Sequence, residues 1–258
     1  MDLGIGNKTA IVCASSKGLG YGCAQALAQA GVNLIICARG SAQLAEAHGN
    51  LEKFNVSVKS FVVDVTSKEG QKKILEVGRD ADILVTNAGG PPPGHWSEWQ
   101  ENNIASALND NMLTPISLIL GIMPQMIEKK WGRIVNITSQ SVKAPIHALG
   151  LSNTARSGLT GFVAGVSRQV ASEGIVMNNL LPGSHDTDRI KALNQSQALK
   201  KNISEGEVKK YALAEIPVGR YGTTEEFGAI CAFLCSIHVG FLVGQNILVD
   251  GGNVNMTF

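Results

Sequence analysis

Seven short apolar runs, separated by longer segments with helical periodicity, constrain the fold of this 258-residue chain more than any other feature. The hydrophobicity of these runs is continuous rather than alternating, which is typical of strands buried on both faces of a parallel sheet. The runs span residues 10–14, 33–37, 58–63, 83–86, 133–138, 176–181 and 246–249. The segments expected to be helical span residues 20–30, 41–54, 68–77, 104–129, 153–173 and 225–236. This alternation predicts an α/β fold, a doubly wound (Rossmann-type) seven-stranded parallel sheet with helices on both faces.

The chain contains no Ser/Gly-rich linker, low-complexity stretch or short-period repeat, so we expect a single domain over residues 1–258. Two segments depart from the alternation of strands and helices. Residues 89–94, with three consecutive prolines, cannot be helical. Residues 184–215 form a polar stretch that is long for a loop, and we expect it to act as a substrate lid.

Charge and composition exclude several classes of partner. The 22 Lys and Arg residues nearly balance 21 Asp and Glu residues, without a basic stripe for nucleic acid or a polybasic segment for a membrane surface. The five cysteines are scattered through apolar runs, which favours buried reduced thiols over disulfides or a metal site. No signal peptide precedes the first strand, and no apolar run approaches the ~18 residues of a membrane span. We therefore expect a soluble cytoplasmic protein that binds no metal.

A glycine-rich turn joins the first expected strand to a helix of small residues. The turn comprises Ala14, Ser15, Ser16, Lys17, Gly18, Leu19 and Gly20. Glycines allow the backbone to approach a pyrophosphate, and the helix N-terminus offers unpaired N–H groups and partial positive charge. The alternative is a purely structural turn, but its position between a first strand and a helix favours a dinucleotide site.

The residue that ends the second expected strand distinguishes between the two nicotinamide dinucleotides. Proteins that select NAD usually place an acidic residue there, to bind the ribose 2′-hydroxyl. Here the strand ends at Arg39, whose guanidinium suits a 2′-phosphate, and Lys17 could add a second cation. The alternative is two ordinary surface cations. We expect NADP(H) rather than NAD(H).

Several motifs, in order along nearly the whole chain, resemble the short-chain dehydrogenases/reductases, and in particular 3-oxoacyl-acyl-carrier-protein reductases. The family's Thr-Gly-x-x-x-Gly-Ile-Gly motif corresponds to residues 13–20, and its Asn-Ala-Gly motif to Asn87, Ala88 and Gly89. Ser139, which closes Ile-Val-Asn-Ile-Thr-Ser, matches the catalytic serine. The family's Pro-Gly-x-x-x-Thr element is also present, as Pro182, Gly183 and Thr187.

The resemblance implies roles for these positions. Asp64 and Val65 would contact adenine, and the segment from Pro182 through Thr187 would contact the nicotinamide carboxamide. Asn111 falls where the family has a helix asparagine that helps to hold a proton-relay water. Residues 216–222 and 244–252 match a segment that packs at subunit interfaces of tetramers, so the resemblance also implies a homo-oligomer, tetramer or dimer.

The sequence departs from the family pattern where a Tyr-x-x-x-Lys pair should carry proton transfer. Counting from Ser139 places Ser152 and Arg156 at these two positions. None of the three tyrosines, Tyr21, Tyr211 and Tyr221, is followed four residues later by lysine. The first glycine of the turn motif is also replaced, by Ala14.

The substitutions affect proton supply more than binding. A serine hydroxyl is far less acidic than a phenol, whose reference pKa is about 10. Arg156 could still grip the nicotinamide ribose, but it does not release a proton at working pH. His147, between Ser139 and Ser152, is a candidate donor, with a surface histidine as the alternative. The same alternatives hold for His185, which follows the Pro-Gly motif.

Two functions remain open from the sequence. The first is an NADP(H)-dependent oxidoreductase that reduces a carbonyl substrate, a ketone or a 3-oxoacyl-like compound, by hydride transfer with an atypical proton donor. The second is an NADP(H)-binding protein with little or no catalysis, acting as a sensor or partner subunit. Losing a positioned general acid typically costs about 10²–10⁴ in rate, so cofactor binding should outlast reductase activity.

Overall fold

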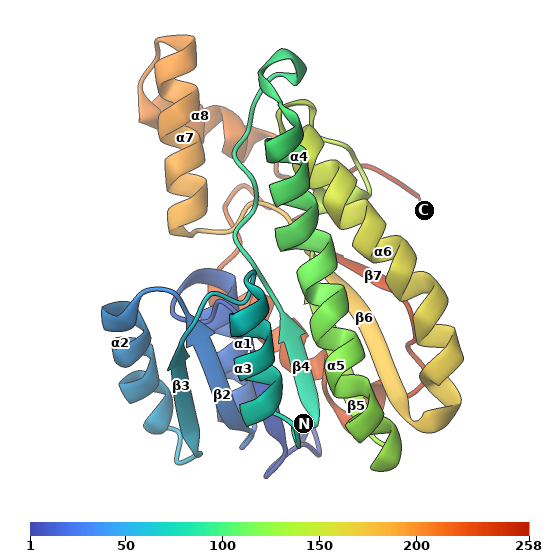
Figure 1. The fold of residues 1–258 in the computed structure, drawn as a ribbon. Helices are drawn as coiled ribbons and strands as arrows, with labels where there is room; N and C mark the ends of the chain where they lie inside the picture. The colour runs from blue at the N-terminus through green and yellow to red at the C-terminus, as the bar shows by residue number, and fades with distance from the viewer. Residues whose placement is uncertain (258) are drawn as a thin grey trace.

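The computed structural model describes residues 1–257 and shows seven parallel strands in one sheet, in the order β3-β2-β1-β4-β5-β6-β7 (Figure 1). The strands are β1 (Thr9–Val12), β2 (Asn33–Ala38), β3 (Val58–Val62), β4 (Ile83–Thr86), β5 (Gly132–Ile137), β6 (Ile175–Pro182) and β7 (Asn246–Val249). Every neighbouring pair is parallel. The predicted doubly wound, single-domain α/β fold is confirmed.

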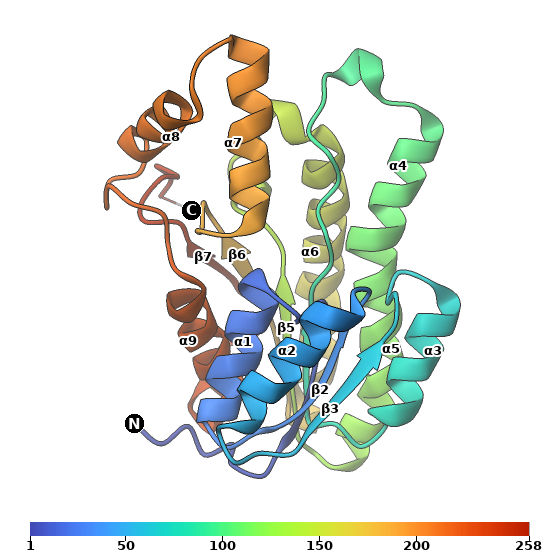
Figure 2. The ribbon, with the colours of Figure 1, turned by 90° about the vertical axis from the view of Figure 1, so that its left-hand side faces the viewer.

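Helices cover both faces of this sheet (Figures 1 and 2). The helices are α1 (Gly18–Gln29), α2 (Ser41–Glu52), α3 (Lys68–Val77), α4 (Glu101–Leu108), α5 (Thr114–Glu128), α6 (Gly150–Val170), α7 (Asp188–Lys201), α8 (Glu205–Ala214) and α9 (Thr224–Leu234). Successive strand residues point into opposite layers: Val12 packs with α1, α2 and α9, and Ile11 packs with α3, α5 and α6. Burial on both faces explains why the central strands β1 and β4 are almost entirely apolar, whereas the edge strand β3 is partly exposed and contains Lys59 and Ser60.

The prediction of one unbroken helix over residues 104–129 is wrong. The structure has α4, then a π-helical turn over Asn109–Leu113, then α5. Single π-helical turns inside α-helices are frequent at functional sites. Here the turn contains the buried Asn111, whose Nδ2 donates to the carbonyl oxygen of Gly89 at 3.3 Å. This hydrogen bond therefore connects the π-helical turn to the loop that follows β4.

The polar stretch 184–215 contains two helices rather than a continuous loop. Helix α7 ends at Asn202, which adopts a left-handed φ of 53°. Helix α8 then begins with a capping box, in which Ser204 Oγ accepts from the Glu207 amide and Glu207 Oε2 accepts from the Ser204 amide. Figures 1 and 2 show α7 and α8 projecting beyond the carboxyl ends of the strands.

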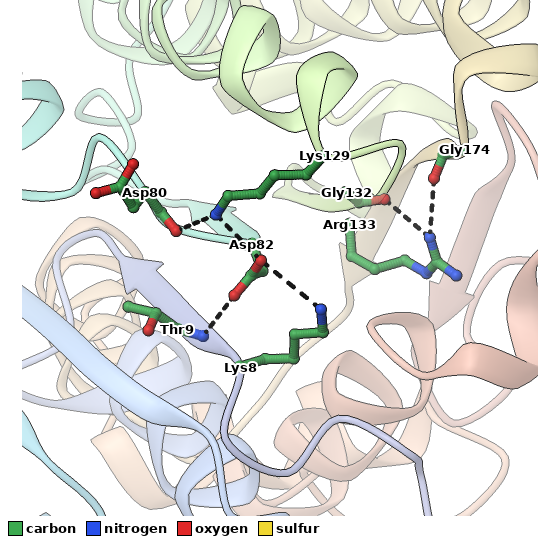
Figure 3. Close-up of polar contacts among 8 residues, drawn as sticks. All are labelled: Lys8, Thr9, Asp80, Asp82, Lys129, Gly132, Arg133 and Gly174. Carbon is green, nitrogen blue, oxygen red and sulfur yellow. Dashed lines mark hydrogen bonds and ion pairs between the residues drawn. The ribbon is translucent and has the colours of Figure 1, made fainter.

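Polar contacts connect the segments at the amino-terminal ends of the strands, which we call the amino-terminal edge of the sheet, as opposed to the carboxyl edge (Figure 3). Asp82, just before β4, accepts from the Thr9 amide at 3.0 Å and pairs with Lys129 at 3.3 Å and Lys8 at 3.8 Å. Buried Arg133 donates through Nη1 to the carbonyl oxygens of Gly132 and Gly174, at 2.9 and 3.3 Å. Within residues 1–257, no helix has the length and apolar character required to cross a membrane.

Candidate active site

A cavity of about 730 Å³ extends over the carboxyl ends of the strands, where ligands bind in open α/β sheets. It begins at the glycine-rich turn after β1 and reaches Ser139 after β5 and the start of α7. The strand order changes direction between β1 and β4, and the cavity spans this point. The fold therefore brings the segments that follow β1, β2, β4, β5 and β6 to one site.

The glycine-rich turn is packed so tightly that a side chain at Gly20 has no room. A Cβ there would lie 2.4 Å from the carbonyl oxygen of Ala14 and 2.8 Å from Nδ2 of Asn87. Lys17, the N-cap residue of α1, makes no side-chain capping bond. The first N–H groups of α1 therefore have no side-chain acceptor at the cap, as an anion-binding helix N-terminus requires.

Ala14 keeps the conformation that the missing glycine would have had. Its φ is 47°, in the left-handed region that favours glycine, so the turn is formed with some strain rather than lost. Asn87 Nδ2 donates to the Ala14 carbonyl at 3.3 Å and holds the turn against the loop after β4. Ser15 is buried, with its hydroxyl bonded to the Val12 carbonyl at 2.8 Å, so its side chain stabilises the turn from within.

The two cations expected around a 2′-phosphate have different surroundings. Arg39 lies on the cavity at the end of β2, mostly exposed, with Nη1 3.9 Å from Asp64 Oδ2. Burial alone would raise the pKa of Asp64, but hydrogen bonds from Thr66 and the charge of Arg39 lower it. Lys17 instead pairs with Asp188 of α7 at 2.8 Å, a link between the turn and the stretch 184–215. Arg39 is the better placed of the two for a phosphate at the end of β2.

The other sequence-predicted cofactor residues also line the cavity. They are Ala14, Ser16, Gly18, Leu19, Asp64, Val65, Asn87, Ala88, Gly89, Pro182, Gly183 and Thr187. Gly20 and Ser15 lie beneath this lining. The positions that the resemblance assigned to a dinucleotide therefore converge on one surface.

Ser139, Ser152 and Arg156 line the same cavity. Ser139 lies just after β5, where its Oγ accepts from the Ser141 amide at 3.1 Å. Ser152 and Arg156 are buried on α6, and Arg156 Nη1 donates to the Ile137 carbonyl at 2.8 Å. Burial, together with the nearby charge of Arg189, lowers the pKa of Arg156 to about 10. At neutral pH, Arg156 therefore keeps its charge.

Several residues that line the cavity carry a buried polar atom with no protein partner within residues 1–257. The atoms are Oδ1 of Asn111, Oγ1 of Thr138, Oε1 of Gln140 and Nε2 of His185. Buried polar atoms are ordinarily hydrogen-bonded, and exceptions need an explanation such as a ligand or water. The residues that carry these atoms all line the same cavity.

The structure gives the two candidate histidines different surroundings. His147 is exposed in a short turn and is absent from the cavity lining, which favours its alternative as a surface histidine. His185 is buried in the lining, and its Nδ1 lies 3.2 Å from the Gly183 carbonyl. Burial lowers the pKa of His185, so it is predominantly neutral near pH 7. Among residues 1–257, no tyrosine lines the cavity.

Sequence reasoning missed Arg189, which also lines the cavity. Its Nη2 donates to the carbonyl of Pro91 at 2.7 Å, joining the start of α7 to the proline-rich loop. The sequence feature that could have identified Arg189 is its position two residues after Thr187, in the first turn of a helix that follows the Pro-Gly motif.

Comparison with known proteins agrees with this geometry. A family model described as enoyl-(acyl carrier protein) reductase matches residues 13–253. The chain is 30% identical, over 254 residues, to the 3-oxoacyl-acyl-carrier-protein reductase FabG of Chlamydia muridarum, covering 95% of this chain and 97% of the relative. The chain belongs to the short-chain dehydrogenase/reductase family. FabG of Vibrio cholerae is 29% identical over 251 residues, covering 95% of this chain and 96% of that protein.

A solved structure of the same dehydrogenase/reductase fold is also close. L-sorbose reductase from Gluconobacter frateurii, complexed with NADPH and L-sorbose, superposes with a TM-score of 0.94 at 27% identity. The match covers 99% of this chain and all of that one. Membership of the short-chain dehydrogenase/reductase family therefore extends over nearly the whole fold, including the segments that form the cavity.

Proposed function

We propose that the protein is an NADP(H)-dependent reductase that transfers hydride to a carbonyl carbon without a tyrosine donor. The observation that carries this proposal is the single cavity that joins the turn after β1 to Ser139, Ser152 and Arg156. The residues fit the cofactor, since the uncapped start of α1 suits a pyrophosphate and Arg39 suits a 2′-phosphate. The NADPH-bound structure of L-sorbose reductase supports the same dinucleotide.

Bound NADPH would supply a hydride to the substrate carbonyl carbon. Ser139 would donate its hydroxyl hydrogen to the carbonyl oxygen and stabilise the negative charge that develops there. Arg156 would bind ribose hydroxyls through the donors that are not bonded to Ile137, and its buried charge would stabilise the same oxyanion. Asp64 and Val65, which line the cavity, would contact adenine, and Thr187, which also lines it, would contact the nicotinamide carboxamide.

The proton for the carbonyl oxygen would come from water. Asn111 bonds Gly89 through Nδ2, which leaves its buried Oδ1 as an acceptor for a relay water. Ser152 can pass hydrogen bonds to such a water but is a weak acid. His185 is less suited as the acid because its pKa is lowered by burial. Unaided proton supply slows the reaction without preventing it.

Single-turnover loss of NADPH absorbance, with a panel of ketones and acyl thioesters, tests the proposal. At least one carbonyl compound should oxidise bound NADPH, and Ser139→Ala should slow that step by about 10²–10³, as for other oxyanion donors. Ser172→Ala, on the exposed surface, is the matched control and should keep the wild-type rate. Tight NADPH binding with no turnover on any carbonyl would overturn the reductase proposal.

The second candidate is an NADP(H)-binding protein with little or no catalysis, acting as a sensor or a partner subunit. Its specific support is the absence of any tyrosine from the cavity lining within residues 1–257. It predicts saturable NADPH binding without oxidation, and turnover by the wild-type protein would exclude it.

The proposal also includes a cytoplasmic homo-oligomer and a lid formed by residues 184–215. Support for the lid is the position of α7 and α8 beyond the strand ends, with Asp188 paired to Lys17 of the turn (Figure 2). NADPH should protect α7 from proteolysis if the stretch closes over it. Light scattering measures the oligomeric state directly.

A further inference from the structure

Two arginines from different elements converge on one point of the cavity. A Cβ built on Gly90 would lie 3.4 Å from Nη2 of Arg189 and 3.8 Å from Nη2 of Arg156. Arg156 comes from α6 and is buried, whereas Arg189 comes from the first turn of α7 and is more exposed. Because Gly90 lacks a side chain, the space between the two guanidinium groups stays open.

No carboxylate within residues 1–257 lies within ion-pairing distance of either arginine. Three acidic side chains line the cavity, and each has other partners. Asp64 lies by Arg39 at 3.9 Å, and Asp188 is paired with Lys17 at 2.8 Å. Asp110 accepts from Asn109 Nδ2 at 3.0 Å. In the part of the chain that the structure describes, no carboxylate neutralises the pair of arginines.

The arrangement is unfavourable for the protein alone. Burial, and then the charge of Arg189, lowers the pKa of Arg156 to about 10, so its charged form is disfavoured. Arg189 occupies the first turn of α7, where the helix dipole is positive and a cation is disfavoured. An anion between the two guanidinium groups would relieve both costs and would accept hydrogen bonds from each.

We infer that Arg189, beside Arg156, selects a carbonyl substrate that also carries a carboxylate, an oxo acid. This inference rests on the proposed reductase function and narrows its substrate class. Arg189 would bind the carboxylate and hold the substrate, while Ser139 in the same cavity binds the carbonyl oxygen. The hydrogen bond from Arg189 to Pro91 fixes the guanidinium beside the proline-rich loop, so the carboxylate position is set by two elements.

A cofactor phosphate is the competing source of negative charge. Other groups in the cavity serve the two phosphate positions better. The uncapped start of α1 suits the pyrophosphate, and Arg39 at the end of β2 suits the 2′-phosphate. The paired arginines lie instead beside Gly90, in the loop after β4. The experiment therefore measures the cofactor and the acid separately.

Two matched sets of probes test the inference. In the kinetic arm, NADPH oxidation is compared for acetoacetate against methyl acetoacetate, and for phenylpyruvate against its methyl ester. In the binding arm, calorimetry compares phenylacetate with phenylacetamide, neither of which carries a reducible ketone, on the complex with NADP⁺. The variants are Arg189→Gln and Arg189→Lys, with Lys191→Gln as a control for charge loss from an exposed position of α7.

We expect wild type to favour each acid over its neutral partner by about 10- to 100-fold, in kcat/KM and in binding. Arg189→Gln should abolish that preference with an unchanged Kd for NADPH, Arg189→Lys should retain part of it, and Lys191→Gln should retain all of it. Equal use or binding of acids and neutral partners by wild type overturns the inference. So does an Arg189→Gln variant that weakens NADPH binding instead of acid binding, since the anion would then be a cofactor phosphate.

The two proposals fail in different ways. If phenylacetate binds through Arg189 but no carbonyl compound oxidises NADPH, the reductase proposal fails and the carboxylate site stands. If NADPH is oxidised equally well by an acid and its ester, the reductase proposal stands and the carboxylate site fails.

Discussion

Arg133 and Arg156 are both buried arginines, but they lie at opposite edges of the sheet and have opposite surroundings. Arg133 donates to the backbone carbonyls of Gly132 and Gly174 (Figure 3) and to that of Ser236, and its guanidinium lies 4.6 Å from the centre of the Trp131 ring. Arg156 has one hydrogen bond within residues 1–257, to Ile137, and a second arginine nearby.

Arg133 has the surroundings of a structural residue, whereas Arg156 has those of a functional one. At the amino-terminal edge, Asp82 bonds the Thr9 amide of β1 and pairs with Lys129, and Arg133 of β5 donates to three backbone carbonyls. At the carboxyl edge, Asn111 and His185 line the cavity, and each has a buried atom with no partner among residues 1–257. Natural proteins place such unsatisfied groups at functional sites and compensate for them elsewhere. Substitutions at the carboxyl edge should therefore lower the free energy of unfolding less than substitutions at the amino-terminal edge.

The largest expected effect follows from restoring the family's proton donor at the carboxyl edge. In Ser152→Tyr with Arg156→Lys, a phenol would face the cavity and the lysine would lower its pKa. Single-turnover NADPH oxidation should accelerate by about 10²–10⁴, the usual contribution of a positioned general acid. The measurement uses the carbonyl compound that wild type reduces fastest, or the whole panel if wild type shows no turnover.

Two further variants make that result interpretable. Ser172→Tyr adds a phenol at an exposed position and should leave the rate unchanged. Ser152→Tyr alone should accelerate NADPH oxidation less than the double variant, because it lacks the lysine that would lower the pKa of the phenol. A double variant that binds NADPH as tightly as wild type but reacts no faster would show that proton supply is not the limiting step.

Replacing each buried arginine by methionine tests the comparison directly. Arg133→Met should lower the free energy of unfolding by about 3 kcal/mol, because three backbone carbonyls lose a charged donor. Arg156→Met should change it by less than about 1 kcal/mol or raise it, because ionised Arg156 opposes folding by an amount on the order of 3 kcal/mol. That gain offsets the lost bond to Ile137.

Urea unfolding of both variants at pH 7 gives the two free energies, with NADPH titration alongside. NADPH affinity should fall only in Arg156→Met. Equal destabilisation by the two substitutions would show that Arg156, like Arg133, is a structural residue.

The sequence predicted the strands far better than the local details of the site. Continuous hydrophobicity reports burial on both faces, which is why β2 and β4 were found within one residue. The π-helical turn at Asn111 depends on a tie to Gly89, and the convergence of Arg156 and Arg189 depends on how α6 and α7 meet the loop after β4. Contacts between residues so far apart have no local signal in a single sequence.

The lowered pKa of Arg156 predicts a pH dependence with a definite sign. Its charge is present below about pH 10 and is lost as the pH rises through that value. Binding of NADPH, whose ribose hydroxyls Arg156 would hold, should therefore weaken above pH 10, by at most tenfold per pH unit. NADPH titrations of wild type and Arg156→Met from pH 8.5 to about 11 measure this, and the ratio of their dissociation constants isolates Arg156. A ratio that stays constant across that range would contradict a titrating Arg156.

Free-protein stability should respond in the opposite direction. Because the pKa of Arg156 is lower in the folded state than in the unfolded chain, the unfolded state binds more protons above about pH 10. The contribution of Arg156 to the free energy of unfolding should therefore rise with pH there. Wild type should gain stability relative to Arg156→Met over the same interval in which it loses NADPH affinity.

The smallest expected effect concerns the strain that remains in the glycine-rich turn. Ala14 has a φ of 47°, a conformation that costs a non-glycine residue about 1–2 kcal/mol. Ala14→Gly removes that cost but gives the unfolded chain more freedom, so the free energy of unfolding should rise by about 0.5–1 kcal/mol net. Gly18→Ala is the matched reverse change, since Gly18 has a φ of 59° and a Cβ there would meet only ordinary contacts with Thr187.

Gly18→Ala should destabilise by about 1 kcal/mol, again through backbone strain. For a chain of this size, each kcal/mol corresponds to a shift in Tm of about 2–4 °C, within reach of differential scanning calorimetry. The turn lies at the carboxyl edge, the same edge as the unsatisfied groups around Arg156. If Ala14→Gly lowers Tm, the left-handed backbone of Ala14 is not strained. The unfavourable interactions at the carboxyl edge would then be limited to the charges around Arg156.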